Sequence, residues 1–356
     1  MNEYQPLLTV VVACYQVEKY LDRCISSISG QTYPNLDILL INDGSADCTG
    51  MICEEWKKRD KRIRVIHKQN EGLALARKTG VENATAEFIT FVDADDWIHA
   101  EMYADMMTAL ISTGSDIAQC GVCLVFDDGS MVIRDGESKT NSFEVVGKTE
   151  GALLILEDKK WRSWMWCKIF KKHLFNNIQF LKGNNFAEDY IAHHLFHKAS
   201  QSVYLHRACY YYYQRNDSIT KSKSLKAEMK NHLDYADAHY DRYLFIEQHP
   251  EYHSILPAHK SFTIYIIIRL LQNIIAFPGY FPKKTFRIKA KQLISISLSK
   301  KDMVPLRWRF YRLILKISRN GFKIIWWMLI RFIIFSNKIT RSNKKHYWLL
   351  SEMIGV

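Results

Sequence analysis

The sequence predicts an α/β fold built on a mostly parallel central sheet, followed by a helical and basic C-terminal extension. Apolar runs of strand length alternate with amphipathic segments of helix length from residue 7 to about residue 125. The first run, LLTVVVAC at 7–14, is almost continuously apolar and rich in β-branched residues, as in a strand buried on both faces. Polar and charged residues follow directly after the strands, where open α/β sheets bind their ligands.

Strands and helices are predicted in regular succession along this first part of the chain. Short β-branched runs bounded by turn residues predict strands, and apolar residues spaced three and four apart predict helices. The predicted strands are residues 7–14, 37–42, 63–67, 88–92 and 116–125. The predicted helices between them are residues 17–29, 48–59, 72–83 and 100–113. Because a helix separates successive strands, these strands are expected to run parallel.

The rest of the chain is less regular. The alternation is lost after residue 125, residues 224–277 have a helical pattern, and Pro278-Gly279 with Pro282 marks a boundary. The sequence therefore predicts a domain at 1–222, a helical extension at 223–279 and a basic amphipathic segment at 280–356. Within the domain, residues 1–125 form one half and residues 126–222 the other.

Positive charge is concentrated at one end of the chain. The formal net charge is +12 at pH 7. Residues 280–345 hold 18 Lys or Arg and one acidic residue, Asp302, so the remainder is mildly acidic. This asymmetry indicates an anionic partner for the C-terminal segment, such as anionic lipid or nucleic acid.

Three carboxylates, Asp93, Asp95 and Asp96, follow directly on the apolar run 88–92. Carboxylates packed this closely repel one another, and a cation would relieve the repulsion. In an extended segment alternate side chains share a face, so Asp93 and Asp95 can converge on one ion. Their oxygen atoms suit Mg²⁺ or Mn²⁺, held jointly with a diphosphate. The alternative is a helix start, because Asp before a helix caps it; Asp96 could cap the next helix in this way while Asp95 binds the metal.

The segment Asn42-Asp43-Gly44-Ser45 follows the second predicted strand. As a turn it requires no function, because Asp-Gly is a good turn former. As a site, the carboxylate of Asp43 would accept a hydrogen bond from the imide N–H of uracil. Tyr15, which follows the first strand, would stack on the same base.

Taken together, the segments VVACYQVEKYLDRCISSISGQTYPNLDILLINDGSADCTG, EGLALARKTG and FITFVDADD resemble family 2 glycosyltransferases with the GT-A fold, a Rossmann-like architecture. The resemblance is close over residues 6–125 and looser to about residue 220. It implies that the first half contacts a nucleotide and that Asp93 and Asp95 hold Mn²⁺ or Mg²⁺, with Asp95 the more direct ligand. The residues that it places near the nucleotide are Ala13, Tyr15, Glu18, Asp43, Arg77 and Asp93.

The second half matches the same family in three places. Phe186-Ala187-Glu188-Asp189-Tyr190 matches the acidic pair, which implies that Asp189, or alternatively Glu188, takes the acceptor proton in an inverting transfer. On its residues alone the pair would be a helix start favoured by the helix dipole. The stretch 166–170 resembles the segment before the pair, which shapes the acceptor pocket. Arg215 lies in the matching segment after the pair and would clamp the diphosphate.

A basic stripe is predicted on a helix near the C-terminus, with its cations three and four residues apart. The stripe consists of Arg309, Arg312, Lys316, Arg319 and Lys323. Trp326 and Trp327 follow, and the apolar stretch is shorter than the about 20 residues of a membrane span. We expect residues 303–345 to lie in an anionic membrane surface. The alternative is an amphipathic helix packed on its own domain.

These features predict a metal-dependent, inverting, non-processive glycosyltransferase. It would move one hexose or N-acetylhexosamine from a nucleotide-diphosphate donor, expected to be a UDP-sugar, to a glycan or lipid-linked glycan in surface polysaccharide biosynthesis. The expected location is cytoplasmic, peripheral at the inner face of the cell membrane. No Q-x-x-R-W segment or multi-span domain is present, which favours stepwise transfer. The alternative is a protein that binds nucleic acid or another anionic surface; nucleic acid is not expected, because the basic residues alternate with Ile, Leu and Trp.

Overall fold

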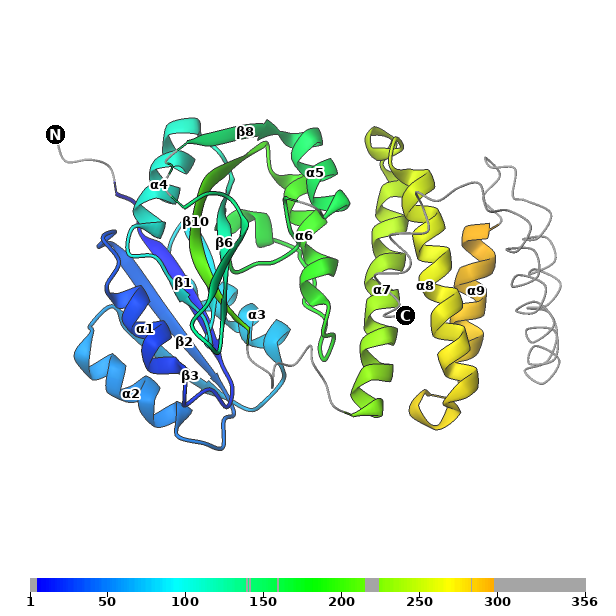
Figure 1. Ribbon diagram of the computed structural model, residues 1–356, viewed down its shortest axis with the longest axis horizontal. Helices are drawn as coiled ribbons and strands as arrows, with labels where there is room; N and C mark the ends of the chain where they lie inside the picture. The colour runs from blue at the N-terminus through cyan, green and yellow to red at the C-terminus, as the bar shows by residue number, and fades with distance from the viewer. Residues whose placement is uncertain are drawn as a thin grey trace. The chain divides into compact units, whose positions relative to one another are not determined.

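The computed structural model describes residues 5–297 apart from residues 139, 141, 159, 215–223 and 283 (Figure 1). The chain divides into a first compact unit, residues 1–259, and a second unit that begins at Lys260. Two sequence predictions, the role of Arg215 and the membrane-surface helix at 303–345, lie outside the described residues. The predicted division of the chain at residues 222 and 279 stays a prediction.

The first unit contains every described strand and most of the described helices. The strands are β1 (Leu8–Cys14), β2 (Leu36–Asp43), β3 (Ile63–Lys68), β4 (Phe88–Asp93), β5 (Trp97–Ile98), β6 (Ile117–Phe126), β7 (Met131–Asp135), β8 (Phe143–Gly147), β9 (Lys168–Lys171) and β10 (Gln201–Gln214). The helices are α1 (Leu21–Ser29), α2 (Thr49–Arg59), α3 (Leu73–Asn83), α4 (Met102–Thr113), α5 (Lys148–Glu157), α6 (Ala187–Lys198) and α7 (Leu225–Gln248). Helix α8 (Leu256–Ala276) begins at the end of this unit, and α9 (Thr285–Ser297) belongs to the second.

The ten strands of the described residues join one sheet, whose order is β3-β2-β1-β4-β9-β6-β10-β5, with β7 paired to β6 and β8 to β10. Strands β1 to β4 are parallel, as predicted, and β6 pairs with β10 in parallel as well. Strand β9 is antiparallel to both β4 and β6, and β5, β7 and β8 add antiparallel pairs. The sheet is therefore mixed in its second half. The sequence loses its strand–helix alternation there, and a short turn without a helix joins β6 to β7, which therefore pair antiparallel.

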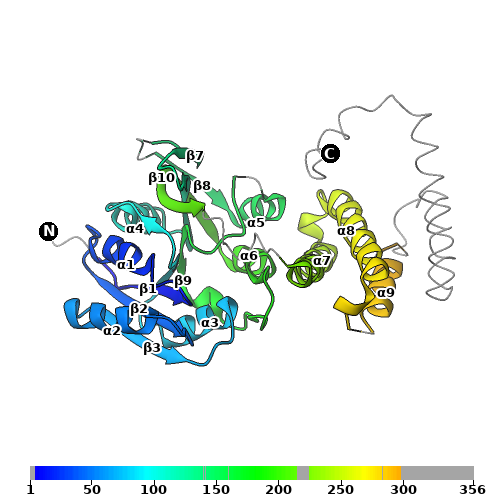
Figure 2. The same ribbon diagram turned by 60° about the horizontal axis from the view of Figure 1, so that its bottom comes forward.

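Helices cover both faces of the sheet, which explains the nearly continuous apolar character of β1. Val10 and Val12 belong to the core beneath α1, α2 and α4, whereas Val11 belongs to the core beneath α3, α5 and α6. Figure 2 shows these two groups of helices on either side of the strands. Strands buried on both faces lack an apolar–polar alternation, and the sequence pattern indicated this arrangement.

Two predicted helices have different bounds in the structure. The helix predicted from residue 17 begins at Leu21, because the N–H of Val17 is held by the Thr49 hydroxyl at 3.0 Å and a turn follows. The helical pattern at 224–277 is two helices, α7 and α8, separated at Pro250, where the proline ring cannot continue a helix. Among the described helices none has the length and apolar character that crossing a membrane requires.

Candidate functional site

The ends of four neighbouring strands bring the predicted residues of the first half to one edge of the sheet. Ala13 of β1 pairs with Asp93 of β4, and β2 ends at Asp43, next to Lys68 of β3. Parallel strands that end in register place the loops after them side by side. The structure thus groups the segments that follow β1, β2, β3 and β4, which the sequence spreads over 80 positions.

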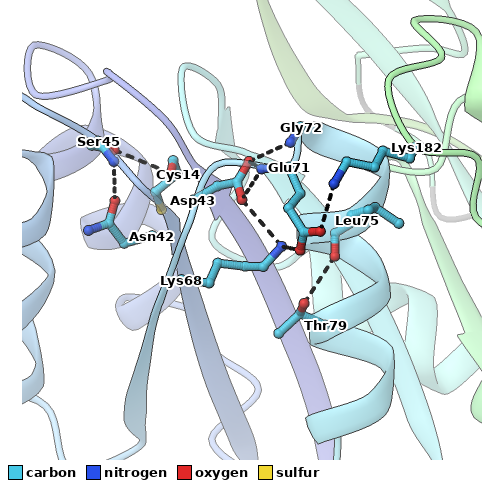
Figure 3. Close-up of polar contacts among 10 residues, drawn as sticks. All are labelled: Cys14, Asn42, Asp43, Ser45, Lys68, Glu71, Gly72, Leu75, Thr79 and Lys182. Carbon is cyan, nitrogen blue, oxygen red and sulfur yellow. Dashed lines mark hydrogen bonds and ion pairs between the residues drawn. The ribbon is translucent and has the colours of Figure 1, made fainter.

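Asp43 is almost fully buried at this edge and binds the loop that begins α3 (Figure 3). Its carboxylate accepts hydrogen bonds from the backbone N–H of Glu71, at 3.1 Å, and of Gly72, at 2.8 Å. The ammonium group of Lys68 lies 3.4 Å from the same carboxylate. The side chain that the sequence assigns to the nucleotide base therefore also holds the start of α3 in place.

The loops after β2 and β3 are packed closely against each other. Gly44 has a φ of +72°, and a Cβ added there would meet the backbone nitrogen of Asn70 at 2.7 Å. Glu71 accepts from Lys68 at 2.7 Å and from Lys182 at 3.1 Å (Figure 3). Lys182 comes from the loop before α6, so the second half of the domain reaches this edge of the sheet.

The segment after β1 exposes an aromatic ring beside these loops. The side chain of Tyr15 is 45% exposed, which suits a residue that stacks on a planar ligand. Gln16 has a φ of +52°, and its N–H donates to the Ser45 hydroxyl at 3.2 Å. Glu18 accepts from the N–H of Cys48 at 2.9 Å, which ties this segment to the start of α2. Ala13 is half-buried at the end of β1.

Arg77 links the two acidic motifs that the sequence analysis treated separately. Its guanidinium group donates to Asp93 Oδ1 at 2.6 Å and forms an ion pair with Glu188 Oε1. The side chain is only 5% exposed, and the two carboxylates come from β4 and from the start of α6. One buried cation thus neutralises one carboxylate of each motif, and Glu188 already has a partner.

Asp95 and Asp96 point to different environments. Asp96 is fully buried and accepts from the Tyr210 hydroxyl and the Tyr213 N–H, both at 2.8 Å, so it holds the end of β10 against the D-x-D loop. Helix α4 begins after Glu101, and the alternative that Asp96 caps it is wrong. Asp95 is half-buried, and its backbone carbonyl accepts from Arg23 at 2.8 Å.

Asp189 lies one residue beyond Glu188 but has other neighbours. Its Oδ1 is 3.5 Å from Nη2 of Arg242 on α7, and the same nitrogen donates to its backbone carbonyl at 3.3 Å. Arg242 also donates to the Ser163 hydroxyl at 3.1 Å. Among the described residues, Asp189 therefore pairs with Arg242 over a long distance, whereas Arg77 binds Glu188 directly.

Burial raises the pKa of both carboxylates of this pair. For Glu188 burial outweighs the opposing effect of Arg77, and for Asp189 it outweighs that of Arg242. The pKa of Arg77 is raised above its usual range, because Glu188 and Asp93 outweigh the opposing effect of burial. A carboxylate with a raised pKa is a stronger base, which is the property that proton abstraction near neutral pH requires.

Aromatic side chains form a wall beside the D-x-D loop. Trp166 stacks on Trp164 with ring centroids 4.6 Å apart and contacts the tilted ring of Tyr210 at 4.3 Å. Lys168 is buried, and its ammonium group donates to the carbonyls of Arg162 and Trp164 at 2.7 and 2.5 Å, which fixes the loop that carries the tryptophans. The predicted acceptor segment 166–170 therefore supports this part of the site from within the core.

Two residues that contact the candidate site residues were not predicted from the sequence. Arg242 lies in a helical segment with no motif, and Tyr210 lies in an aromatic run that reads as an ordinary strand. Both contact acidic residues of the predicted motifs across distances of 53 and 114 residues. No local pattern carries this information, because the pairing depends on how α7 and β10 pack in the fold.

Comparison with known proteins places these features in a family. The model of Glycosyl transferase family 2 matches residues 9–186. Glycosyltransferase GlyA of Streptococcus pneumoniae is 32% identical over 219 residues, which are 60% of this chain and 31% of GlyA. The uncharacterized glycosyltransferase EpsJ of Bacillus subtilis is 31% identical over 231 residues, which are 64% of this chain and 67% of EpsJ. The chain therefore spans less than a third of GlyA and two thirds of EpsJ.

Solved structures show the same architecture. Staphylococcus aureus TarS, residues 1–349 in complex with UDP-GlcNAc, matches with a TM-score of 0.59 and 21% sequence identity over 88% of each chain. A second structure of TarS residues 1–349 matches with a TM-score of 0.57. At this identity the similarity concerns the fold, and it confirms the predicted α/β architecture around a central sheet.

Proposed function

This chain belongs to glycosyl transferase family 2 and has the GT-A fold, and on that premise we propose that it moves a single sugar from a nucleotide-diphosphate donor to a glycan or lipid-linked glycan. We propose a UDP-sugar as the donor, since TarS with the same fold was solved with UDP-GlcNAc. Assembly of a bacterial surface polysaccharide is the proposed setting. The glycosyltransferase relatives GlyA and EpsJ support the proposed reaction class.

One observation carries the proposal: acidic groups from both halves of the domain meet at one edge of the sheet. Arg77 contacts Asp93 of the D-x-D segment and Glu188 of the acidic pair, which are separated by 95 positions. A donor that binds beyond β1, β2 and β4 therefore lies next to the residues proposed to act on the acceptor. Nucleic-acid binding rests on Lys and Arg contacts to phosphate and gives no role to such a grouping of carboxylates.

The donor-binding role rests on the residues around the end of the sheet. Tyr15 would stack on the base, Asp43 would accept from its imide N–H, and Glu18 and Ala13 would shape the same segment. The carboxylates of Asp93, the last residue of β4, and Asp95, two residues beyond it, would supply oxygen ligands to Mn²⁺ or Mg²⁺. Oδ1 of Asp93 is paired with Arg77, so Asp95 is the more direct ligand that we propose. A cation held there would neutralise charge on the leaving diphosphate. Arg215 would assist from the segment after β10.

Asp189 is the residue that we propose as the base. The acceptor hydroxyl attacks the anomeric carbon, the bond from that carbon to the diphosphate oxygen breaks, and the Asp189 carboxylate takes the hydroxyl proton. Attack from the face opposite the diphosphate inverts the anomeric centre. Glu188 is the weaker candidate, because its carboxylate is bound to Arg77 and is not available for a proton without losing that pair.

A donor screen with two matched variants tests this proposal. The unmodified chain is incubated with UDP-, GDP- and dTDP-sugars, with Mn²⁺ or Mg²⁺, and the released nucleoside diphosphate is measured by mass spectrometry. Asp189→Asn should lower transfer by roughly 10²–10⁴-fold, the usual contribution of a general base. It should leave donor binding, measured by calorimetry, within twofold. Glu188→Gln is the matched control for the acidic pair and should lower transfer much less.

The outcomes separate the assignments from one another. Full turnover in Asp189→Asn with loss in Glu188→Gln would move the base to Glu188. Release of no nucleoside diphosphate with any donor, by a chain that binds none of them, would contradict the proposed function itself. Asp95→Asn should weaken both metal and donor binding, and unchanged binding would remove Asp95 from the metal site.

A further inference from the structure

A second group of metal-ligating side chains lies between α6 and α7, apart from the D-x-D segment. His193 and His194 come from α6 and Asp241 from α7. Among the described residues, their ligand atoms all lie within 4.8 Å of one another. Asp241 Oδ2 is 3.3 Å from His193 Nε2 and 3.4 Å from His194 Nε2. The Nε2 atoms of both histidines thus lie close to the same carboxylate oxygen of Asp241.

Two atoms of this group are buried without a hydrogen bond. His193 is fully buried, and its Nε2, like Oδ2 of Asp241, makes no hydrogen bond with any described residue. The other ring nitrogen of His193, Nδ1, lies 3.3 Å from the backbone carbonyl of Asp189. With the proton on Nδ1, bonded to that carbonyl, the Nε2 lone pair would face the carboxylate oxygen. Two acceptors in contact repel each other unless a cation lies between them.

The surroundings keep His193 in the form that binds metals. Metal-bound histidines frequently donate their other ring N–H to a backbone carbonyl, as Nδ1 would here. This hydrogen bond fixes the tautomer and the ring orientation. Phe245 packs against the rings of both histidines, with centroids 4.7 and 5.1 Å away, and covers the group with apolar surface.

The two distances from the Asp241 oxygen to the histidine nitrogens also fit a metal, and all three ligand atoms lie within 4.8 Å of one another. In a tetrahedral site with bonds of about 2.0–2.2 Å, neighbouring ligand atoms are about 3.3–3.5 Å apart. The two distances from Asp241 Oδ2, 3.3 and 3.4 Å, fall in this range. Two imidazoles and one carboxylate form a ligand set that binds Zn²⁺ with a fourth position for water. Mg²⁺ prefers oxygen ligands, so this group differs in metal preference from the carboxylates of the D-x-D segment.

We propose that His193, His194 and Asp241 bind a divalent transition-metal ion, with Zn²⁺ the best match. The ion joins α6 to α7 through their side chains. Asp189 precedes His193 by one helical turn, and Arg242, which contacts Asp189, is adjacent to Asp241. The site therefore positions the surroundings of Asp189 through α6 and through Arg242. Metal binding here does not depend on the proposed transfer reaction and can be measured without it.

Zinc binding by the full-length chain tests the proposal. The protein is freed of metals with a chelator and titrated with Zn²⁺ by calorimetry in excess Mg²⁺, which occupies oxygen-only sites. Co²⁺ is the spectroscopic substitute, because a tetrahedral site gives an intense visible absorption. We expect one Zn²⁺ per chain, and an at least tenfold loss of affinity in His194→Gln and in Asp241→Asn. Both side chains are partly exposed, so these variants avoid the fully buried His193.

Two variants serve as controls. His197→Gln alters a neighbouring histidine of α6 that bonds Tyr252 instead, and Asp95→Asn alters the D-x-D segment. Both should bind Zn²⁺ as the unmodified chain does. Zn²⁺ should also raise the midpoint of thermal unfolding of the unmodified chain and not that of Asp241→Asn. The proposal is wrong if the unmodified chain takes up no Zn²⁺, or if folded His194→Gln and Asp241→Asn bind it with undiminished affinity.

Discussion

Arg77 is the residue on which the contact between the two halves of the candidate site depends. Its side chain is 5% exposed and has a carboxylate partner on each side, Asp93 and Glu188. A buried charge is tolerated when it is paired and becomes costly when one partner is removed. The glycosyltransferase resemblance placed Arg77 near the nucleotide, and the structure adds that it bridges the strand end and the acidic pair.

Replacing Arg77 should therefore affect stability and transfer together. Arg77→Gln leaves two carboxylates without their cation and should lower the free energy of unfolding by about 3–5 kcal/mol, the usual effect of breaking a buried pair. Arg77→Lys keeps the charge but cannot bond both carboxylates with a planar guanidinium group. It should therefore lower the free energy of unfolding by less than Arg77→Gln does. Urea unfolding of the three proteins measures the difference. Equal stability of Arg77→Gln and the unmodified chain would show that the pairs contribute nothing.

The raised pKa of Asp189 predicts the acidic limb of the pH profile. A base must be unprotonated, so transfer should fall as pH drops through a pKa above the ordinary aspartate value of about 3.9. Arg242 lowers this pKa, so Arg242→Gln should move the limb to higher pH. Profiles of kcat/KM against pH measure both effects. If the acidic limb stays in place in Arg242→Gln but moves in Glu188→Gln, the limb reports the pKa of Glu188 and not that of Asp189.

At the scale of elements, α3 lies against β1 because a glycine allows it. A Cβ added at Gly80 would meet Cγ1 of Val11 at 2.2 Å, so the helix could not keep its distance from the sheet. Helix α3 carries Arg77 one turn before Gly80, and the close approach sets the position of the guanidinium group at the sheet edge. Packing of one helix thus determines the geometry of the site.

Gly80→Ala should destabilise the fold, by about 1–3 kcal/mol, because overpacking forces the helix or Val11 to move. Gly151→Ala is the matched control, since Gly151 also lies on a helix against the sheet but its Cβ would meet only ordinary contacts from 3.4 Å outward. That change should be neutral or stabilising by up to about 1 kcal/mol, as alanine favours helix. Chemical denaturation measures both, and equal effects would contradict the packing argument.

Strands β1, β2 and β3 are also joined by polar contacts of Asp37. Its carboxylate accepts two bonds from Arg64 at 2.7 Å and further bonds from the hydroxyls of Thr9 and Thr85. Burial raises the pKa of Asp37, but these hydrogen bonds outweigh it, and the net pKa is lowered. The carboxylate therefore stabilises the fold above its ordinary pKa of about 3.9 and loses this effect as pH falls through the lowered value.

Asp37→Asn should remove the stabilisation that the carboxylate provides, so its difference in stability from the unmodified chain should depend on pH. Near pH 7 the variant should be less stable by about 1 kcal/mol, because Arg64 is 43% exposed and solvent screens the pair. The difference should shrink below about pH 4, when the wild-type carboxylate becomes protonated. Urea unfolding at several pH values measures it. A difference that grows toward low pH would contradict the sign of the pKa shift.

At the scale of the whole molecule, the uneven charge predicts where the protein binds. Residues 280–345 hold 18 Lys or Arg and one acidic residue, against a mildly acidic remainder. The membrane-surface helix at 303–345 lies beyond the described residues, so its role rests on the sequence pattern. An acceptor linked to lipid would be reached from that surface, and for this reason we propose a peripheral location at the cytoplasmic face of the membrane.

Vesicle flotation of the full-length chain tests this location. Binding to phosphatidylglycerol vesicles should exceed binding to neutral vesicles and fall with salt. A variant with Arg312, Lys316 and Arg319 changed to Gln should bind roughly 100-fold less, since each cation contributes about 1 kcal/mol. The matched control changes three exposed cations at the end of α2, Lys57, Lys58 and Arg59, and should bind normally. A salt-sensitive gel shift without flotation would favour nucleic acid instead.

The sequence by itself determined the α/β class, the succession of strands and helices through residue 125, and the segments that end at the ligand edge of the sheet. These features can be predicted because burial makes apolar residues recur with the period of the strand or helix, and because turn residues favour particular backbone conformations. The family resemblance rested on the same short segments, such as those around Asp43 and Asp93. Helix bounds differed by a few residues where a turn, as at Val17, replaced the first helical turn.

Only the tertiary structure decided which side chains meet. Arg77 pairs with Glu188 across 111 residues, and Asp96 holds Tyr213 across 117. It also turned the second half into a mixed sheet and brought His193 to Asp241. The physical reason is that a polar side chain is fixed by its burial and by the partner that satisfies it, and both depend on how distant segments pack. The hydrophobic periodicity of a segment therefore does not predict which distant side chain it will pair with.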